Sequence, residues 1–310
     1  MKNIVITGGF GFIGKKLTDH FLKNNINVII LEHPEAIKPD SFPDVEVLPF
    51  DILWEEKGDF PVIKNCDALL HLAAQSSGPR SFSIPEIDIK LNVLGTLNTI
   101  NLCLKNNIEK ILFASSFVVY GDHPEKESLD ENTCCQPKSV YAGSKLAAEH
   151  LLKNYAGPKG IHWNSLRMFN VYGPGQDITK PDQGVVGIFL NMLLKSDTID
   201  IKGSLNRFRD LVFIDDIISA WSLCLEKGVR NKAYNIGSGR KTTYHDLILK
   251  IAEILGKKDR LNINELEGTP GDLMGCFADT QLAKMDFGFE SKVDILSGLD
   301  KMINSVLNRF

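Results

Sequence analysis

The fold of this 310-residue chain is decided by the stretch Asn3-Ile4-Val5-Ile6-Thr7-Gly8-Gly9-Phe10-Gly11-Phe12-Ile13-Gly14. Its apolar first half is bounded by glycine and predicts a buried parallel strand over residues 3–7. A helical pattern through Leu17, Phe21 and Leu22 follows the glycine-spaced turn. A helix that begins after such a turn offers unpaired amides and a positive dipole end, and glycine lets the backbone approach an anion. The stretch predicts a pyrophosphate site, and the alternative is a plain tight turn.

A second apolar run, residues 27–31, ends at Glu32. In dinucleotide-binding folds an acidic residue lies about 20 residues beyond the glycines, where it accepts hydrogen bonds from the adenosine ribose. A carboxylate at this place repels a 2′-phosphate, so Glu32 indicates NAD rather than NADP. The alternative is that Glu32 caps the loop that continues through Pro34.

Further apolar runs have the length of buried strands and end in polar or small residues. Residues 45–50 lead to Asp51 and Ile52, residues 66–72 lead to Ala73, Ala74 and Gln75, and residues 110–114 lead to Ser115 and Ser116. Ligands bind at the carboxyl ends of strands in doubly wound sheets. The pattern predicts an α/β fold of Rossmann type with these ends at one edge, and His71 packed inside.

Residues 85–106 form a helical stretch whose apolar side chains recur at helical spacing. Asn92 and Gly95 interrupt this apolar stripe, which indicates close packing against another element. Residues 163–169 are a further strand, after which the alternation of strand and helix weakens. Residues 211–216 and 234–238 resemble returns to the sheet, and residues from 242 onward are rich in helical patterns.

This order of strands and helices predicts two lobes. The nucleotide-binding domain is predicted to comprise residues 1–168 plus 211–237. A smaller C-terminal α/β lobe for the substrate is predicted to comprise residues 169–210 plus 238–310. A chain of this length often divides in this way.

A tyrosine and a lysine stand one helical turn apart in the middle of the chain. Ser139 precedes an Ala- and Leu-rich run and predicts a helix start, so Tyr141 and Lys145 share one helix face. A tyrosine phenol titrates near ~10, and a neighbouring ammonium favours the phenolate and lowers that pKa. The pair predicts an acid/base and makes one of the two serines, Ser115 or Ser116, a candidate catalytic hydroxyl; the alternative is an ordinary solvated helix face.

Composition excludes several classes of function. The 35 basic and 39 acidic side chains give a net charge of −4 without a basic block, which argues against nucleic-acid and anionic-membrane partners. No apolar run reaches transmembrane length and no secretory signal is present, so we expect a cytoplasmic protein. The six cysteines show no metal spacing and the seven histidines are scattered, so no metal site is expected.

Motifs along nearly the whole chain resemble those of the extended short-chain dehydrogenase/reductases, in the branch of NAD-dependent nucleotide-sugar epimerases and dehydratases. They occur in the family's order at residues 7–14, 71–74, 115–116, 119–121, Tyr141 with Lys145, 167–174, 209–210, 234–238 and 278–279.

The resemblance implies roles for these positions. Tyr141 would be the acid/base, Lys145 would lower its pKa and hold the nicotinamide ribose, and Ser116 would bond the reacting sugar oxygen. The implied cofactor-binding set is Gly8, Gly11, Phe12, Ile13, Gly14, Glu32, Asp51, Ile52, Leu72, Ala73, Ala74, Gln75, Asn92, Ser115, Tyr141, Lys145 and Phe169. The implied substrate-binding set is Ser116, Asn170, Val185, Arg207, Arg209, Asp272 and Cys276.

Two departures from the family pattern matter. Phe117 and Val118 stand where dehydratases carry an acidic pair or a glutamate, and apolar residues cannot supply the acid and base that eliminate water. Thr269 stands where epimerases have an arginine that binds the diphosphate, and Arg207 is a candidate replacement. Cys276, four positions after Asp272, is small and leaves room for an N-acetyl group.

The resemblance implies an NAD-dependent 4-epimerase of a UDP-sugar (UDP-glucose and UDP-galactose, or their N-acetylhexosamine equivalents) that acts through a 4-keto intermediate. The alternative is an NAD(P)H-dependent reductase of a 4-keto nucleotide sugar; a 4,6-dehydratase and a non-catalytic NAD-binding protein are further possibilities. The family also implies a homodimer that forms through residues 85–106 and 139–155.

Overall fold

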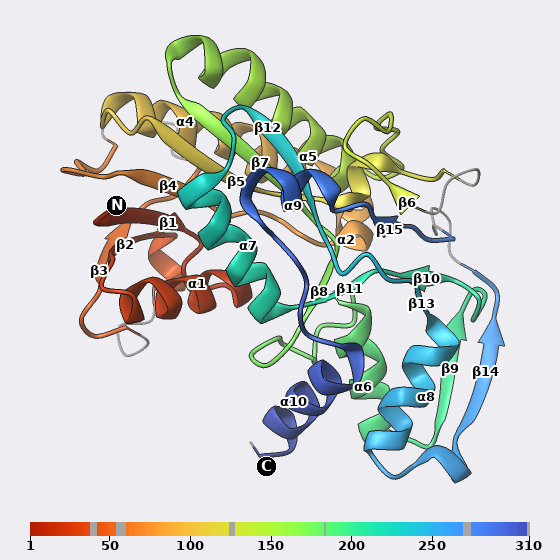
Figure 1. Ribbon diagram of the computed structural model, residues 1–310. Helices are drawn as coiled ribbons and strands as arrows, with labels where there is room; N and C mark the ends of the chain where they lie inside the picture. Colours follow the sequence, from red (N-terminus) through yellow and green to blue (C-terminus); the bar gives the residue numbers. More distant parts are fainter. Residues whose placement is uncertain (38–41, 54–59, 124–127, 183, 269–273, 309–310) are drawn as a thin grey trace.

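A seven-stranded parallel sheet forms the centre of the molecule (Figure 1). The computed structural model describes residues 1–37, 42–53, 60–123, 128–182, 184–268 and 274–308. The strand order is β12-β7-β5-β4-β1-β2-β3, and every neighbouring pair is parallel. This order confirms the predicted doubly wound sheet. The strands are β1 (Asn3–Thr7), β2 (Asn27–Glu32), β3 (Glu46–Pro49), β4 (Ala68–His71), β5 (Lys110–Ser116), β7 (His162–Met168) and β12 (Lys232–Ile236).

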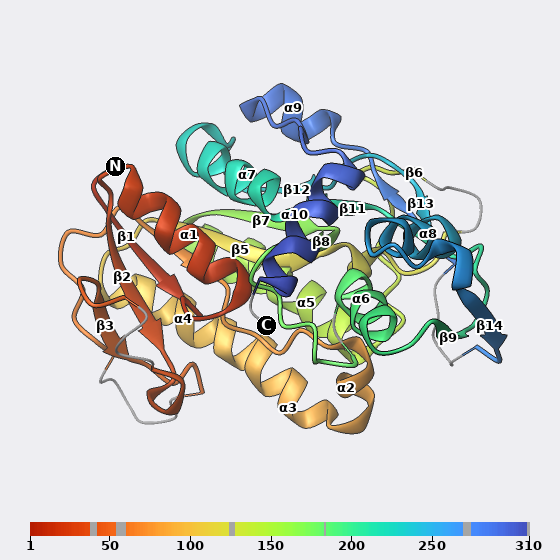
Figure 2. The same cartoon turned by 90° about the horizontal axis from the view of Figure 1, so that it is seen from below.

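Helices cover both faces of this sheet because successive strand side chains point to opposite sides. Ile4 and Ile6 of β1 pack in one core with α1 (Phe12–Lys23) and α7 (Ile214–Lys227). Val5 packs in a second core with α4 (Gly95–Lys105) and α5 (Val140–Leu151). Figure 2 shows α1 and α7 on one side and α4 on the other.

The predicted helix over residues 85–106 consists of three pieces. They are α3 (Pro85–Ile89), a π-helical turn (Lys90–Leu94) and α4. A Cβ atom at Gly95 would lie 2.7 Å from Cδ1 of Ile52, so this glycine permits the close packing expected from the sequence. A π-helical turn within a helix often accompanies a functional site.

The C-terminal part of the chain adds short two-stranded sheets and four helices. β9 (Thr198–Lys202) pairs with β14 (Asn262–Leu266), β10 (Phe208–Arg209) with β13 (Thr242–Thr243), and β6 (Ser128–Leu129) with β15 (Phe277–Ala278). The helices here are α6 (Val185–Lys195), α8 (Tyr244–Ile254), α9 (Gln281–Phe287) and α10 (Ile295–Leu307), and α2 (Gly78–Ser83) precedes α3. Among the described helices, none is long and apolar enough to cross a membrane.

One sequence expectation about the sheet is wrong. The first of the two expected returns contains β11 (Leu211–Phe213), which pairs with β8 (Asn170–Tyr172) in a separate two-stranded sheet. β7 already has β5 on one edge and β12 on the other, so it has no edge left for β11. The second expected return, β12, does join the sheet.

Candidate active site

The glycine turn after β1 has the geometry that a pyrophosphate requires. Gly8 has φ of +72°, and a Cβ there would lie 2.8 Å from the amide nitrogen of Ala73. A Cβ at Gly14 would overlap the carbonyl oxygen of Gly8. Helix α1 begins after Gly11 with no side-chain cap and no acidic residue in its first turn, so its amides are available to an anion.

Two carboxylates lie at or just after the ends of the neighbouring strands β2 and β3. Glu32 at the end of β2 accepts hydrogen bonds from the amides of Phe10, at 3.1 Å, and His33, at 3.3 Å. Asp51 accepts from the amide of Leu53 at 2.8 Å. The turn and Glu32 therefore lie together, as the dinucleotide motif predicts.

The loop after β4 is held against β1. Thr7 Oγ1 accepts hydrogen bonds from the amides of Leu72 and Ala73, both at 3.2 Å. His71 lies buried between Thr7 Oγ1, 2.8 Å from its Nδ1, and Thr96 Oγ1, 3.2 Å from its Nε2. Burial and, secondarily, the charge of Lys145 lower the pKa of His71 to about 3, so the ring is neutral. The prediction that His71 is a packed interior residue is confirmed.

The predicted catalytic hydroxyls meet at the carboxyl end of β5. Ser139 accepts a hydrogen bond from the amide of Ala142 at 3.1 Å and caps α5, which confirms the predicted helix start. Tyr141 in the first turn lies beside Ser116, the last residue of β5. Burial raises the pKa of Tyr141 to about 12; the Ser116 hydroxyl opposes this rise, and the charge of Asp88 adds to it.

Lys145 lies one turn further along α5 and is 3% exposed. Its Nζ donates to the carbonyl of Ala114 at 2.9 Å and lies 4.7 Å from the centre of the Phe113 ring. Burial lowers the pKa of Lys145 to about 8, against the charges of Asp88 and Glu149, which raise it. Burial is the largest cause of the raised pKa of Tyr141, and the Lys145 ammonium bonds the Ala114 carbonyl. That Lys145 lowers the pKa of Tyr141 when the cofactor is bound stays a prediction.

Ser115, which the sequence assigned to the cofactor, directs its hydroxyl into the interior. It donates to Glu149 Oε1 at 2.5 Å, and Arg167 donates to the same carboxylate through Nε, at 3.0 Å, and Nη2, at 2.7 Å. The side chain of Ser115 is thus bound to Glu149, and a contact with a cofactor would have to use its backbone.

Other predicted positions are divided between cofactor and substrate regions. Phe169 stacks on Phe117 with ring centres 5.1 Å apart, and both belong to a buried cluster that includes Cys276. Burial raises the pKa of the Cys276 thiol to about 12, and the charge of Arg209 opposes this rise. The structure therefore brings Cys276 and Arg209 close to the end of β5. The predicted cofactor residues Gln75, Asn92 and Ile52 are buried, and Phe12, Ile13 and Ala74 are partly buried.

The remaining predicted substrate residues differ in their surroundings. Asn170 Oδ1 is buried and has no hydrogen-bond partner within the described residues. Arg207 is 8% exposed, bonds the carbonyls of Lys202 and Ser204, and stacks on Tyr244, so its guanidinium stabilises the turn between β9 and β10. Val185 begins α6. Asp272 and Thr269 lie outside the described residues.

The sequence interpretation missed a polar group at this site. Asp88 in α3 is 1% exposed and accepts hydrogen bonds from Ser144, at 2.5 Å, and Gln75, at 2.6 Å. A signal was present, because Asp88 lies four residues before Asn92, and such residues share a helix face. Two polar residues one turn apart, within a helical stretch that is expected to be buried, indicate a buried polar contact.

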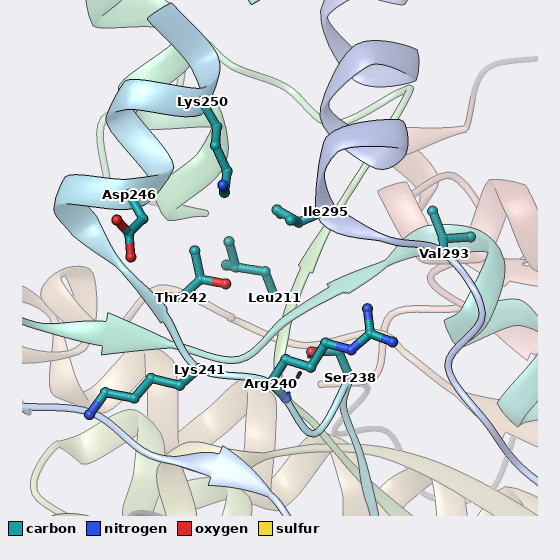
Figure 3. A pocket seen from close by; sticks show the side chains of 9 residues that line it. All are labelled: Leu211, Ser238, Arg240, Lys241, Thr242, Asp246, Lys250, Val293 and Ile295. Atoms are coloured by element: carbon teal, nitrogen blue, oxygen red, sulfur yellow. Dashed lines mark hydrogen bonds between the residues drawn. The ribbon is translucent and has the colours of Figure 1, made fainter. Parts of the chain in front are cut away.

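A separate depression of about 270 Å³ lies in the C-terminal part of the chain, between α8 and the segment that leads into α10 (Figure 3). Lys250 and Ile295 point toward one another across it, and Arg240 lies near Ser238 at its edge. Its lining includes none of the three predicted catalytic residues.

Comparison with known proteins agrees with this geometry. The pattern of the NAD dependent epimerase/dehydratase family matches residues 4–237. A putative UDP-glucose 4-epimerase of Methanocaldococcus jannaschii is 33% identical, with 98% of each chain covered. A dTDP-4-dehydro-6-deoxyglucose reductase of Escherichia coli is 31% identical, with 98% of this chain and 97% of that protein covered.

A solved structure supports the same assignment. It is a UDP-N-acetylglucosamine 4-epimerase from Methanobrevibacter ruminantium M1 in complex with UDP-N-acetylmuramic acid, with a TM-score of 0.90 and 28% identity. The alignment covers 100% of this chain and 99% of that one. From the family match over most of its length, the seven-stranded sheet and the glycine turn beside Glu32, the chain belongs to the NAD-dependent epimerase/dehydratase family.

Proposed function

We propose that this protein is a 4-epimerase of a UDP-sugar that works through bound NAD and a 4-keto intermediate. The observation that carries the proposal is the meeting of Tyr141 in the first turn of α5 with Ser116 at the carboxyl end of β5, with Lys145 buried one turn away and bonded to the Ala114 carbonyl of β5. The similarity to proteins named as UDP-sugar 4-epimerases supports it.

The chemistry that NAD supplies when bound is acceptance of a hydride from carbon 4 and its return to the opposite face. The Tyr141 phenolate takes the proton of the 4-hydroxyl and gives it back to the oxygen on carbon 4 when the hydride returns. Ser116 bonds the same sugar oxygen. Lys145 supplies a positive charge that favours the phenolate, and the charge of an oxidised nicotinamide acts in the same direction.

The anion-binding groups support a diphosphate-bearing substrate. Asn170 on β8 can donate from its side-chain NH2 group, and Arg209 lies on β10. Arginine suits this work because its planar fork donates paired hydrogen bonds to phosphate oxygens. A 4,6-dehydratase is disfavoured because Phe117 is stacked on Phe169 and Val118 beside it is also apolar.

The experiment that tests the proposal is incubation of the holoenzyme with a panel of UDP-sugars, followed by chromatography of the products. Interconversion of a 4-epimeric pair without added cofactor is the expected result. If none of the UDP-sugars in the panel is converted, the proposed epimerase activity is rejected.

The second candidate is a reductase of a 4-keto nucleotide sugar, which the 31% identity to the Escherichia coli reductase favours. The same Ser116, Tyr141 and Lys145 would act once, and the oxidised cofactor would leave. Dependence of turnover on added NADH with a 4-keto substrate would identify the reductase, whereas NAD retained through purification supports the epimerase.

We further propose that the site accepts N-acetylhexosamines, because Cys276 is small and lies in the cluster beside Phe117 and Phe169. The likeness to an N-acetylglucosamine 4-epimerase supports this. Cys276→Tyr is expected to abolish activity with UDP-GlcNAc selectively and to spare UDP-glucose, and Cys276→Ser, which stays small, serves as the control. Equal losses on both sugars in the tyrosine variant would contradict the proposal.

A further inference from the structure

Four charged side chains are buried around the catalytic helix α5. They are Asp88, Lys145, Glu149 and Arg167, and each is less than 9% exposed. A buried charge is costly unless an opposite charge or several hydrogen bonds compensate it. We therefore ask which of these four groups compensate one another and which remain to act on Lys145 and the acid/base Tyr141.

Glu149 and Arg167 compensate each other. The guanidinium donates two hydrogen bonds to the carboxylate, at 3.0 Å and 2.7 Å, and Ser115 donates a third. This bidentate pair is the strong form of an ion pair in an interior. Lys145 and Asp88 are then the two buried charges that this ion pair does not compensate.

Asp88 is held by uncharged groups. Oδ1 accepts from Ser144 Oγ at 2.5 Å and from Asn92 Nδ2 at 3.4 Å, and Oδ2 accepts from Gln75 Nε2 at 2.6 Å. None of these donors balances its negative charge. Ser144 is the residue immediately before Lys145, and the charge of Asp88 raises the pKa of both Lys145 and Tyr141.

The same hydrogen bonds connect three elements of the site. Asn92 in the π-helical turn accepts from the amide of Gln75 at 3.0 Å and donates to Ser144 at 2.9 Å. Gln75 follows the predicted cofactor loop after β4, and Ser144 belongs to α5. Asp88 is thus the acceptor on which the loop, the π-helical turn and α5 converge.

We propose that Asp88 is a positioning residue whose buried carboxylate balances the charge of Lys145 and holds α5 against the loop after β4. The proposal rests on the proposed function for its effect on catalysis, and on the contacts alone for its effect on stability.

The other charged groups near α5 do not replace Asp88. Glu149 is paired with Arg167, and His71 on β4 is neutral. Asp182 accepts a hydrogen bond from Ser77 at 2.6 Å, beyond Gln75. Among the charged residues of α2, α3 and the π-helical turn, which pack against α5, the exposed ones are Arg80, Glu86 and Lys90.

Asp88→Asn removes the charge at nearly constant shape. Loss of a negative charge makes protonated Lys145 less favourable and the Tyr141 phenolate more favourable, so both pKa values fall. Both limbs of the pH profile of kcat/KM in the holoenzyme are expected to move to lower pH by about one unit. Asp88→Glu keeps the charge and is expected to restore the limbs toward their original positions.

Asp216→Asn is the matched control. Asp216 is also buried and is held by neutral donors, Ser291 Oγ at 2.8 Å and the amides of Lys292 and Val293 at 3.1 Å, at the start of α7. This variant is expected to lower the melting temperature and leave the pH limbs in place. An unmoved profile in Asp88→Asn, or an equal displacement in Asp216→Asn, overturns the proposal.

A thermal double-mutant cycle tests the charge balance without turnover and covers the case in which Asp88→Asn folds poorly. At pH 6, where Lys145 is charged, Asp88→Asn combined with Lys145→Met is expected to melt at a higher temperature than Asp88→Asn alone. Strictly additive losses overturn the proposal. If the protein converts no UDP-sugar, the proposed function fails while this cycle still decides the role of Asp88.

Discussion

At the scale of single residues, Tyr141 is the side chain on which the proposed chemistry depends. Its phenol lies beside Ser116, and burial raises its pKa to about 12, well above neutrality. The bound cofactor and Lys145 must therefore supply the positive charge that makes a phenolate accessible near pH 7.

Tyr141→Phe keeps the ring and removes the acid/base. Turnover is expected to fall by about 10²–10⁴-fold, with fold and NAD content unchanged. Tyr155→Phe is the control. The Tyr155 hydroxyl donates to Asn101 at 2.9 Å and is not part of the predicted site, so this variant is expected to keep its turnover. Similar rates for Tyr141→Phe and the unmodified protein would show that the phenol takes no part.

A second prediction at this scale concerns the preference for NAD over NADP at Glu32. Its carboxylate is directed to the glycine turn by the amide of Phe10, so a 2′-phosphate would meet a negative charge. Titration of cofactor-free protein is expected to show at least a ten-fold preference for NAD over NADP, about 1.4 kcal/mol. Glu32→Ser is expected to reduce that preference. Equal affinities in the unmodified protein would refute the role given to Glu32.

At the scale of elements, the outer face of α3 and the π-helical turn carries apolar side chains in contact with solvent. Ile87, Ile89 and Leu94 are exposed along this segment. Exposed apolar patches of this kind mark interaction surfaces. They support the prediction that the chain forms a homodimer through this face and α5.

The homodimer is tested by light scattering at micromolar concentration, where the unmodified protein is expected to have twice the mass of one chain. Leu94→Asp places a charge in the predicted interface and is expected to yield monomers. Met285→Asp alters an exposed apolar residue of α9 and is expected to leave the dimer intact. A monomeric unmodified protein would contradict the prediction.

At the scale of the whole molecule, the pair of Arg167 and Glu149 joins β7 to α5, and through Ser115 to β5. Arg167 also donates to the hydroxyl of Tyr120 at 2.9 Å, and that hydroxyl donates to Asn235 of β12. Burial of both charges makes their pairing important for global stability.

Glu149→Gln leaves the buried Arg167 charge without its partner. The free energy of unfolding is expected to fall by about 3–5 kcal/mol in denaturant titrations. Glu253→Gln breaks an exposed ion pair with Lys258 and is expected to change the same quantity by less than about 0.5 kcal/mol. Comparable small effects in both variants would argue that Arg167 finds another partner.

The sequence by itself was sufficient to predict the sheet, the glycine turn beside Glu32, the cap at Ser139 and the family. Each of these depends on residues close together in the chain or on a motif with fixed spacing. The shared helix face of Tyr141 and Lys145 is local in the same sense.

Only the tertiary structure decided the pairing of β11, the inward direction of Ser115 and the contacts of Asp88. These depend on which strand edges are already occupied and on partners 34 and 56 residues away, as for Ser115 with Glu149 and Asp88 with Ser144. The raised pKa of Tyr141 belongs to the same class, because burial depends on the packing of distant segments.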